Sequence, residues 1–188
     1  MAIVDNNPLL SKISGMLGDT VVFRMWRGRM LMSNRPKKRE KLSDKQKVTV
    51  DRFKLAARYA VTQMKDPAAK LDYGKGTNFQ KHSAYLVALC DHMNPPKVHY
   101  IKADDYTGAV GETIAIKATD DFKVVRVKVS ITDSDGVVLE QGDAVATVRK
   151  PWIWKYQTTV LNTMAKGTMI RATAYDKPGN RDSAEVVL

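Results

Sequence analysis

The chain of 188 residues, 44% hydrophobic and 27% charged, has an ordinary globular composition, which argues against wholesale disorder. Its single cysteine excludes an internal disulfide framework, and no apolar run approaches the length that spans a bilayer. The net charge of +11 is confined to the first 101 residues, which carry 19 Lys and Arg against 8 Asp and Glu, whereas the remainder carries 12 of each. This asymmetry indicates two modules, of which the basic one faces an acidic partner.

The first elements predicted along the chain are an extended arm over residues 1–19 and a β-hairpin over residues 20–34. The arm holds glycine and proline among scattered apolar residues, and a turn is expected at residues 14–15. The hairpin is expected to turn at residues 27–28, where a glycine can take the positive φ that a tight turn needs. Because an isolated hairpin is marginally stable, this one is expected to need a partner or the rest of the chain.

The register that this turn sets gives the hairpin two different faces. Met25 is expected to oppose Met30 and Phe23 to oppose Met32, and residues that oppose each other share a face. One face is therefore predicted to be apolar, and it consists of Val21, Phe23, Met25, Met30 and Met32. The other face mixes cations with apolar residues, and it consists of Val22, Arg24, Trp26, Arg29 and Leu31.

A dense basic segment, residues 35–39, follows the hairpin and adds four cations to those of the hairpin. We interpret the cations as a docking element, because the arginine fork pairs bidentately with carboxylates and phosphates. Trp26 lies between two of them and could stack on a base or on a partner side chain. The plainer alternative is a solvated loop. The cations of the hairpin and the segment are Arg24, Arg27, Arg29, Arg35, Lys37, Lys38 and Arg39.

Two helices are predicted after the basic segment. Ser43 and Gln46 fit a capping box at the start of the first helix, and Asp66-Pro67 is expected to close it. A second helix is expected over residues 78–92 and ends before two consecutive prolines, which mark a boundary between domains 1–97 and 98–188. The apolar stripe of the first helix consists of Phe53, Ala56, Ala57, Ala60 and Met64.

Beyond the prolines the hydrophobic period changes from that of a helix to that of a strand. Short alternating runs are separated by turn signals, a pattern typical of a β-sandwich. The fold class predicted for the whole chain is therefore α+β, with a basic arm, hairpin and two helices followed by an antiparallel sandwich. The runs are residues 112–118, 124–132, 137–144, 144–150, 152–160, 168–176 and 184–188.

The segment GTMIRATAYDKPGNRDSAEVVL resembles the closing strands of bacterial immunoglobulin-like or fibronectin-like domains. Their last hairpin often reads as a strand, then Ala-x-Asp-x-x-Gly-Asn, then a final strand. Ala174, Asp176, Gly179 and Asn180 match that pattern. The resemblance implies an immunoglobulin-like sandwich over about residues 100–188, and it implies little about function, because such sandwiches carry many.

The segment SGMLGDTVVFRMWRGRMLMSNRPKK, followed by RFKLAARYA, resembles small proteins of phages that infect Bacteroidetes-type hosts. Together with the sandwich, the chain resembles a virion structural protein of a crAss-like or related tailed phage. The resemblance implies a head, connector or tail component. It is carried by Ser14, Gly15, Gly18, Val22, Phe23, Gly28, Arg35, Pro36, Gln46, Arg52 and Phe53.

Catalysis and metal binding have little support in the sequence. There is no nucleophile elbow, P-loop, HExxH motif or glycine-rich dinucleotide turn, so we expect no enzyme and no cofactor. Cys90, His92 and His99 lack a standard zinc spacing, so no metal site is predicted there. Calcium at one end of the sandwich remains the alternative, with Asp104, Asp105, Asp120, Asp121 and Asp176 as its possible ligands.

The predicted function is a non-enzymatic bacteriophage virion protein, most simply a head–tail connector or tail ring component assembled in the host cytoplasm. Its expected partners are portal, ring, tail or capsid subunits and copies of itself, with non-specific nucleic acid contact possible and no membrane contact. The alternatives are a capsid decoration protein, a DNA-binding architectural protein and a carbohydrate-adhesion module that uses Trp152 and Trp154. The predicted docking residues are Val21, Phe23, Arg24, Met25, Trp26, Arg27, Arg29, Met30, Met32, Arg35, Lys37, Lys38 and Arg39.

Overall fold

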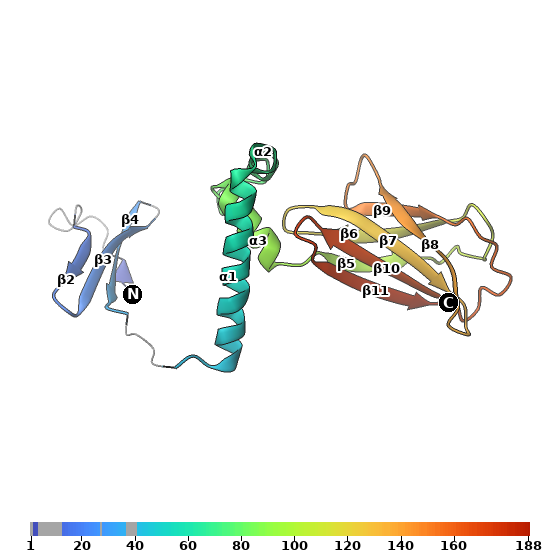
Figure 1. Cartoon of the computed structure of the whole chain (residues 1–188), viewed down its shortest axis with the longest axis horizontal. Coiled ribbons are helices and arrows are strands. Elements are labelled where there is room, and N and C mark those ends of the chain that lie inside the picture. The colour runs from blue at the N-terminus through green and yellow to red at the C-terminus, as the bar shows by residue number, and fades with distance from the viewer. Residues whose placement is uncertain (1, 4–12, 27, 37–40) are drawn as a thin grey trace. The chain divides into compact units, whose positions relative to one another are not determined.

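The computed structural model of the chain describes residues 2–3, 13–26, 28–36 and 41–188 (Figure 1). Its contacts divide the chain into two compact units, residues 1–46 and 47–188, which are described separately below. The change from helices to strands lies near residue 97, as expected, but the helices belong to the same compact unit as the strands. No helix of the described residues is long and apolar enough to cross a membrane.

The first unit is a small antiparallel sheet in the order β1-β4-β3-β2. The predicted hairpin register is confirmed, because Met25 opposes Met30 and Phe23 opposes Met32. Gly28 has a φ of 75°, the left-handed conformation that the turn was expected to need. The predicted arm contributes two further short strands to the sheet. The strands are β1 (Ala2–Ile3), β2 (Gly15–Leu17), β3 (Val21–Trp26) and β4 (Arg29–Asn34).

The helical segment contains three helices where the sequence predicted two. The capping box at the start of α1 (Asp44–Lys65) is confirmed, because Ser43 N–H donates to Gln46 Oε1 at 3.1 Å and Gln46 N–H donates to Ser43 Oγ at 3.3 Å. Asp66 ends α1 as predicted, but its carboxylate also accepts a hydrogen bond from the N–H of residue 68. It therefore caps a further helix, α2 (Pro67–Gly74).

The last helix, α3 (Ala84–Met93), begins later than the predicted residue 78. Asn78 does not enter a helix, because its side chain accepts hydrogen bonds from the N–H groups of Gln80 and Lys81, both at 2.8 Å, and closes a turn. Ser83 then caps α3 by accepting from the N–H of residue 86. The start of α3 is therefore set by hydrogen bonds of nearby side chains, and not by the point where apolar residues begin to recur at helical spacing.

The three helices pack around a small apolar core centred on a fully buried tyrosine of α2. The stripe of α1 reaches this core only through its C-terminal half, so Phe53 is half exposed although the sequence placed it on the buried side. The buried members of the core are Ala56, Ala60, Tyr73, Val87, Ala88 and Leu89.

Residues 97–188 form seven antiparallel strands in the order β11-β10-β7-β8-β9-β6-β5, which confirms the predicted β-rich half of an α+β fold. The sheet curls over until β5 lies beside β11, as Figure 1 shows, and the N–H of Val98 donates to Asp182 Oδ2 at 2.9 Å between them. The sequence did not predict β5. The strands are β5 (Lys97–Lys102), β6 (Thr113–Thr119), β7 (Val124–Thr132), β8 (Val138–Ala146), β9 (Ile153–Gln157), β10 (Met169–Asp176) and β11 (Arg181–Val187).

Alternate residues of these strands point into one core, as the period of two requires. Trp154 and Tyr156 of β9 are core residues, so the aromatic alternation of this strand fills the sandwich and is not an open ladder. The core also contains Val98, Ala103, Tyr106, Ile114, Ile116, Ala118, Val127, Val129, Ile131, Ala144, Ile170, Ala172 and Ala174.

The helices are joined to one end of the sandwich by a charged contact and an aromatic contact. Asp72 of α2 accepts hydrogen bonds from Lys123 Nζ at 2.7 Å and from Lys177 Nζ at 2.9 Å, and these lysines follow β6 and β10. The rings of Tyr73 and Phe122 lie beside this pairing, with centroids 4.7 Å apart. The two lysines lower the pKa of the Asp72 carboxyl from 3.8 to about 2.

An Asp72→Asn variant is therefore expected to lose about 1 to 2 kcal/mol of unfolding free energy at pH 7. Because the pKa of Asp72 is lower in the folded state, its stabilisation is complete above pH 4 and fades as the pH falls towards 2. Urea titrations of both proteins at several pH values should show the difference shrinking over that range. Asp51→Asn removes the exposed pair with Lys54 and should change stability by less than about 0.5 kcal/mol.

Candidate functional site

The predicted docking face of the hairpin is only partly open to a partner. Phe23 and Met30 are 6% and 4% exposed, so these two residues contribute to the interior of the first unit and are not free docking residues. Met25 and Trp26, at the turn end of β3, are each 53% exposed. The apolar surface available for docking therefore lies at the turn end of the hairpin and not along its whole length.

The burial of Leu31 shows that both faces of the hairpin are partly covered. Leu31 is on the mixed face, opposite Arg24 in the register, yet it is 5% exposed. The sequence predicted this face to mix cations with apolar residues, and Leu31 is its buried apolar member.

Strand β2 adds apolar surface that the sequence analysis did not assign. Met16 and Leu17 are both well exposed, and Leu17 opposes Val21 in the register of the sheet. Val21 and Met32 themselves are half-buried. A strand of three residues is too short for the alternation of apolar and polar residues to predict which of its side chains are exposed.

The cations of the first unit that the structure describes lie on its surface. Arg24 and Arg29 are exposed on the same face as Trp26. Arg35 pairs with Asp19, and its N–H donates to the carbonyl of Thr20 at 2.8 Å, so it also holds the end of β4. The predicted docking residues Arg27, Lys37, Lys38 and Arg39 lie outside the described residues.

The N-terminal half of α1 carries a second group of exposed apolar side chains. Val48, Phe53 and Leu55 are all half exposed or more, and they precede the part of α1 that enters the apolar core of the helices. Large apolar residues at several exposed positions of one helix are a common feature of helices that pack against another chain.

A cluster of three carboxyl groups lies where the helices meet the sandwich. Asp91 of α3, Asp120 after β6 and Asp176 at the end of β10 each bring one carboxylate oxygen within 4.8 Å of the others. Asp91 is fully buried and Asp176 is 3% exposed. The sequence analysis grouped Asp120 with Asp176 at one end of the sandwich but missed Asp91, because a single aspartate on a helix carries no signal of its own.

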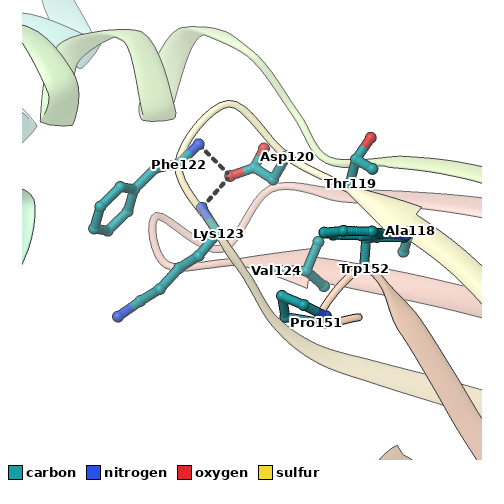
Figure 2. A pocket seen from close by; sticks show the side chains of 8 residues that line it. All are labelled: Ala118, Thr119, Asp120, Phe122, Lys123, Val124, Pro151 and Trp152. Carbon is teal, nitrogen blue, oxygen red and sulfur yellow. Dashed lines mark hydrogen bonds between the residues drawn. The ribbon is translucent and has the colours of Figure 1, made fainter. Parts of the chain in front are cut away.

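Each member of this acidic cluster is held by a specific hydrogen bond. Tyr73 donates its hydroxyl proton to Asp91 Oδ2 at 2.7 Å, and Asn180 Nδ2 donates to Asp176 Oδ2 at 2.7 Å. Asp120 Oδ2 accepts from the N–H groups of residues 122 and 123, as Figure 2 shows. The three carboxyl groups are therefore oriented by the surrounding structure.

Burial changes the acidity of this cluster. Removal from water, reinforced by the neighbouring Asp120 and Asp176 and opposed by the hydrogen bond from Tyr73, raises the pKa of Asp91 to about 8. Burial also raises the pKa of Asp176. Like charges at this distance oppose each other, so the cluster needs a proton or a cation to be stable at neutral pH.

The other possible calcium ligands do not join the acidic cluster. Asp104 and Asp105 follow β5 and therefore lie at the opposite end of the sandwich. Asp121 points to Lys81, whose Nζ is 2.7 Å away; burial would raise the pKa of Asp121, but the bonds from Lys81 and Asn94 outweigh it and lower the pKa. Asp133 closes the hairpin turn that the sequence predicted, by accepting from the N–H groups of residues 135 and 137.

The cysteine and histidine residues are placed in ordinary contacts. His92 stacks near the ring of Tyr59, with centroids 5.1 Å apart, and His99 Nε2 lies 2.6 Å from the hydroxyl of Thr119. Burial raises the pKa of the Cys90 thiol. Within the part of the chain that the structure describes, these three residues do not gather into a group with metal-ligand distances.

A pocket of 280 Å³ opens beside the turn that carries Asp120 (Figure 2). Trp152 lines it and is 45% exposed, and its ring lies near Val124 and Pro151 in Figure 2. Trp154 faces the core, so Trp152 stands without the second tryptophan that the carbohydrate alternative uses. One exposed aromatic ring is therefore available for a sugar, where the sequence suggested two.

Comparison with protein-family models found no match, and comparison with curated proteins found none. Among solved structures, the crystal structure of CopC from Methylosinus trichosporium OB3b matches with 12% sequence identity and a TM-score of 0.35, covering 48% of this chain and 87% of that chain. A similarity this low carries no argument about function. The functional conclusions therefore rest on the surfaces and clusters described above.

Proposed function

We propose that the chain is a non-enzymatic structural protein of a tailed-phage virion, a connector or tail ring component that docks through its first unit. The observation that carries the proposal is the concentration of exposed apolar side chains there, next to exposed arginines. Exposed apolar surface of this kind marks protein interaction sites. The exposed large apolar residues of the first unit are Ile13, Met16, Leu17, Met25, Trp26 and Leu42.

The apolar residues supply the affinity in this proposal, and the cations supply the orientation. Burying a side chain such as Met25 or Leu17 against a partner contributes about 1.5 to 3 kcal/mol when it goes from exposed to fully buried. Exposed arginines such as Arg24 and Arg29 contribute little by themselves, but they steer the encounter with an acidic surface and exclude partners of the same charge. The expected occupant is therefore an acidic subunit of the same particle that carries apolar pockets.

The direct test is the copy number of the protein in purified particles from its source, measured by quantitative mass spectrometry against the major shell protein. About a dozen copies per particle would support a ring at a single vertex, as cyclic symmetry allows. Several hundred copies per particle would contradict the ring and indicate a protein that decorates the capsid. Absence from the particles would overturn the virion proposal.

A DNA-binding architectural role is the second candidate, because Arg24 and Arg29 share an exposed face with Trp26. Stacking on Trp26 together with phosphate contacts is the arrangement that proteins use for single-stranded nucleic acid. Fluorescence anisotropy with single-stranded DNA at increasing salt separates the candidates. Affinity that stays submicromolar near physiological salt and falls steeply above it supports the DNA role, whereas weak binding throughout supports protein docking.

A further inference from the structure

The acidic cluster contains buried oxygen atoms that no hydrogen-bond donor satisfies. Asp91 Oδ1 is fully buried and has no partner within the described structure, and the same is true of Asp120 Oδ1. One carboxylate oxygen of each residue lies within 4.8 Å of the other, and two carboxylates can share a hydrogen bond only if one of them carries a proton. A buried polar atom without a partner is rare and indicates a missing ligand, water or ion.

The nearby lysines do not neutralise the three carboxyl groups. Lys123 and Lys177 both bond to Asp72, and Lys81 bonds to Asp121. In the described part of the chain, the ion pairs of these lysines therefore leave the charge of the cluster uncompensated. An uncompensated buried carboxylate costs several kcal/mol, so the cluster calls for another positive charge.

The donor set of the cluster decides which ion would fit. All three side chains offer carboxylate oxygen and none offers nitrogen or sulfur. Oxygen donors select hard cations, and separations of up to 4.8 Å between ligand atoms suit one ion with metal–oxygen distances of 2.0–2.6 Å. Tyr73 orients Asp91 through Oδ2 and leaves Oδ1 without a partner, an arrangement common around metal sites. Asp176 is held through both oxygens, by Asn180 Nδ2 and by the N–H of residue 179.

We propose that Asp91, Asp120 and Asp176 bind one divalent cation of the calcium or magnesium class at the junction of α3 with the sandwich. The ion joins three elements that are far apart in the sequence: helix α3, the turn after β6 and the end of β10. Its role is structural, because it fixes the helices to the sandwich end where Asn180 also donates to the carbonyl of His92 at 3.3 Å. The site shares no residue with the docking surface proposed for the first unit.

The test uses the full chain, stripped with EDTA and dialysed, and measures calcium and magnesium binding by calorimetry and by the thermal unfolding midpoint. We expect one ion per chain and a midpoint that rises by several degrees with at least one of the two ions. No binding at millimolar concentrations of either ion would overturn the proposal and leave a shared proton as the explanation of the cluster.

Two variants distinguish this site from adventitious surface binding. Asp91→Asn and Asp120→Asn each remove one ligand charge, and Asp120→Asn keeps the buried Asp91 in place in case the first variant does not fold. We expect each variant that folds to lose at least tenfold in affinity. The matched control is Asp104→Asn at the opposite end of the sandwich, which should bind as tightly as the unchanged protein. Equal affinity in all three variants would show that the ion binds elsewhere.

Discussion

A Gly108→Ala variant is expected to lose about 2 to 5 kcal/mol of unfolding free energy. Gly108 has a φ of +98°, and an alanine there would carry the strain of about 1 to 2 kcal/mol that a side chain meets in this region. The added Cβ would also lie 2.1 Å from the carbonyl oxygen of Asn162. The carbonyl of Asn162 is backbone and cannot rotate away as a flexible side chain can. Overpacking is therefore expected to lower the free energy of unfolding by a further ~1 to 3 kcal/mol.

The clash at Gly108 would spread because Asn162 belongs to a buried hydrogen-bond network. Its N–H donates to the carbonyl of Gly108 at 2.8 Å, and its side chain donates to the hydroxyl groups of Thr168 at 2.8 Å and Tyr106 at 3.3 Å. Moving Asn162 to relieve the clash would weaken these bonds together. The connection between β5 and β6 would then separate from the loop that precedes β10.

Gly136→Ala is the matched control for this variant. Gly136 has a φ of +85° in the turn between β7 and β8, but its added Cβ would meet nothing within 4 Å. The Gly136→Ala variant should therefore lose only the unfolding free energy that comes from backbone strain, about 1 to 2 kcal/mol. Urea unfolding curves of the unchanged protein and the two variants give the loss of unfolding free energy for each variant. Equal losses in the two variants would show that the contact with Asn162 does not matter.

The sequence predicted those elements whose local signals and tertiary environment agree. The hairpin register was correct because a glycine at a tight turn and strict alternation define the same pairing. The capping box of α1 was correct because Ser43 and Gln46 satisfy each other within one turn. The turn between the predicted runs 124–132 and 137–144 was correct because the side chain of Asp133 accepts hydrogen bonds from the backbone that follows it.

The missed elements depend on neighbours that are distant in the sequence. Strand β5 pairs with β6 and lies beside β11, and its own run directly after two prolines shows little alternation. The burial of Leu31 likewise depends on what covers the sheet and not on the hairpin itself. Asp91 was missed from the acidic cluster for the same reason, since Asp91 and Asp176 are 85 positions apart and meet only because α3 packs on the sandwich end.

A Met25→Glu variant is expected to enter particles at least tenfold less efficiently than the unchanged protein, if the proposed docking function is correct. Met25 is 53% exposed at the turn end of β3, where the hairpin presents most of its open apolar surface. A glutamate there would have to be desolvated against an apolar pocket, and it would repel an acidic partner. A loss of 1.4 kcal/mol is sufficient for a tenfold change, and truncating a central interface residue often costs more.

Val148→Glu is the control for this variant, because it makes the same chemical change at a residue of the sandwich that is 99% exposed. It should enter particles normally. Methyl resonances of Met30, which is buried and opposes Met25, report whether the first unit stays folded in the Met25→Glu protein. A folded Met25→Glu protein that still assembles would exclude the hairpin from the interface. The exposed residues of α1, Val48 and Leu55, would then be the remaining apolar contact.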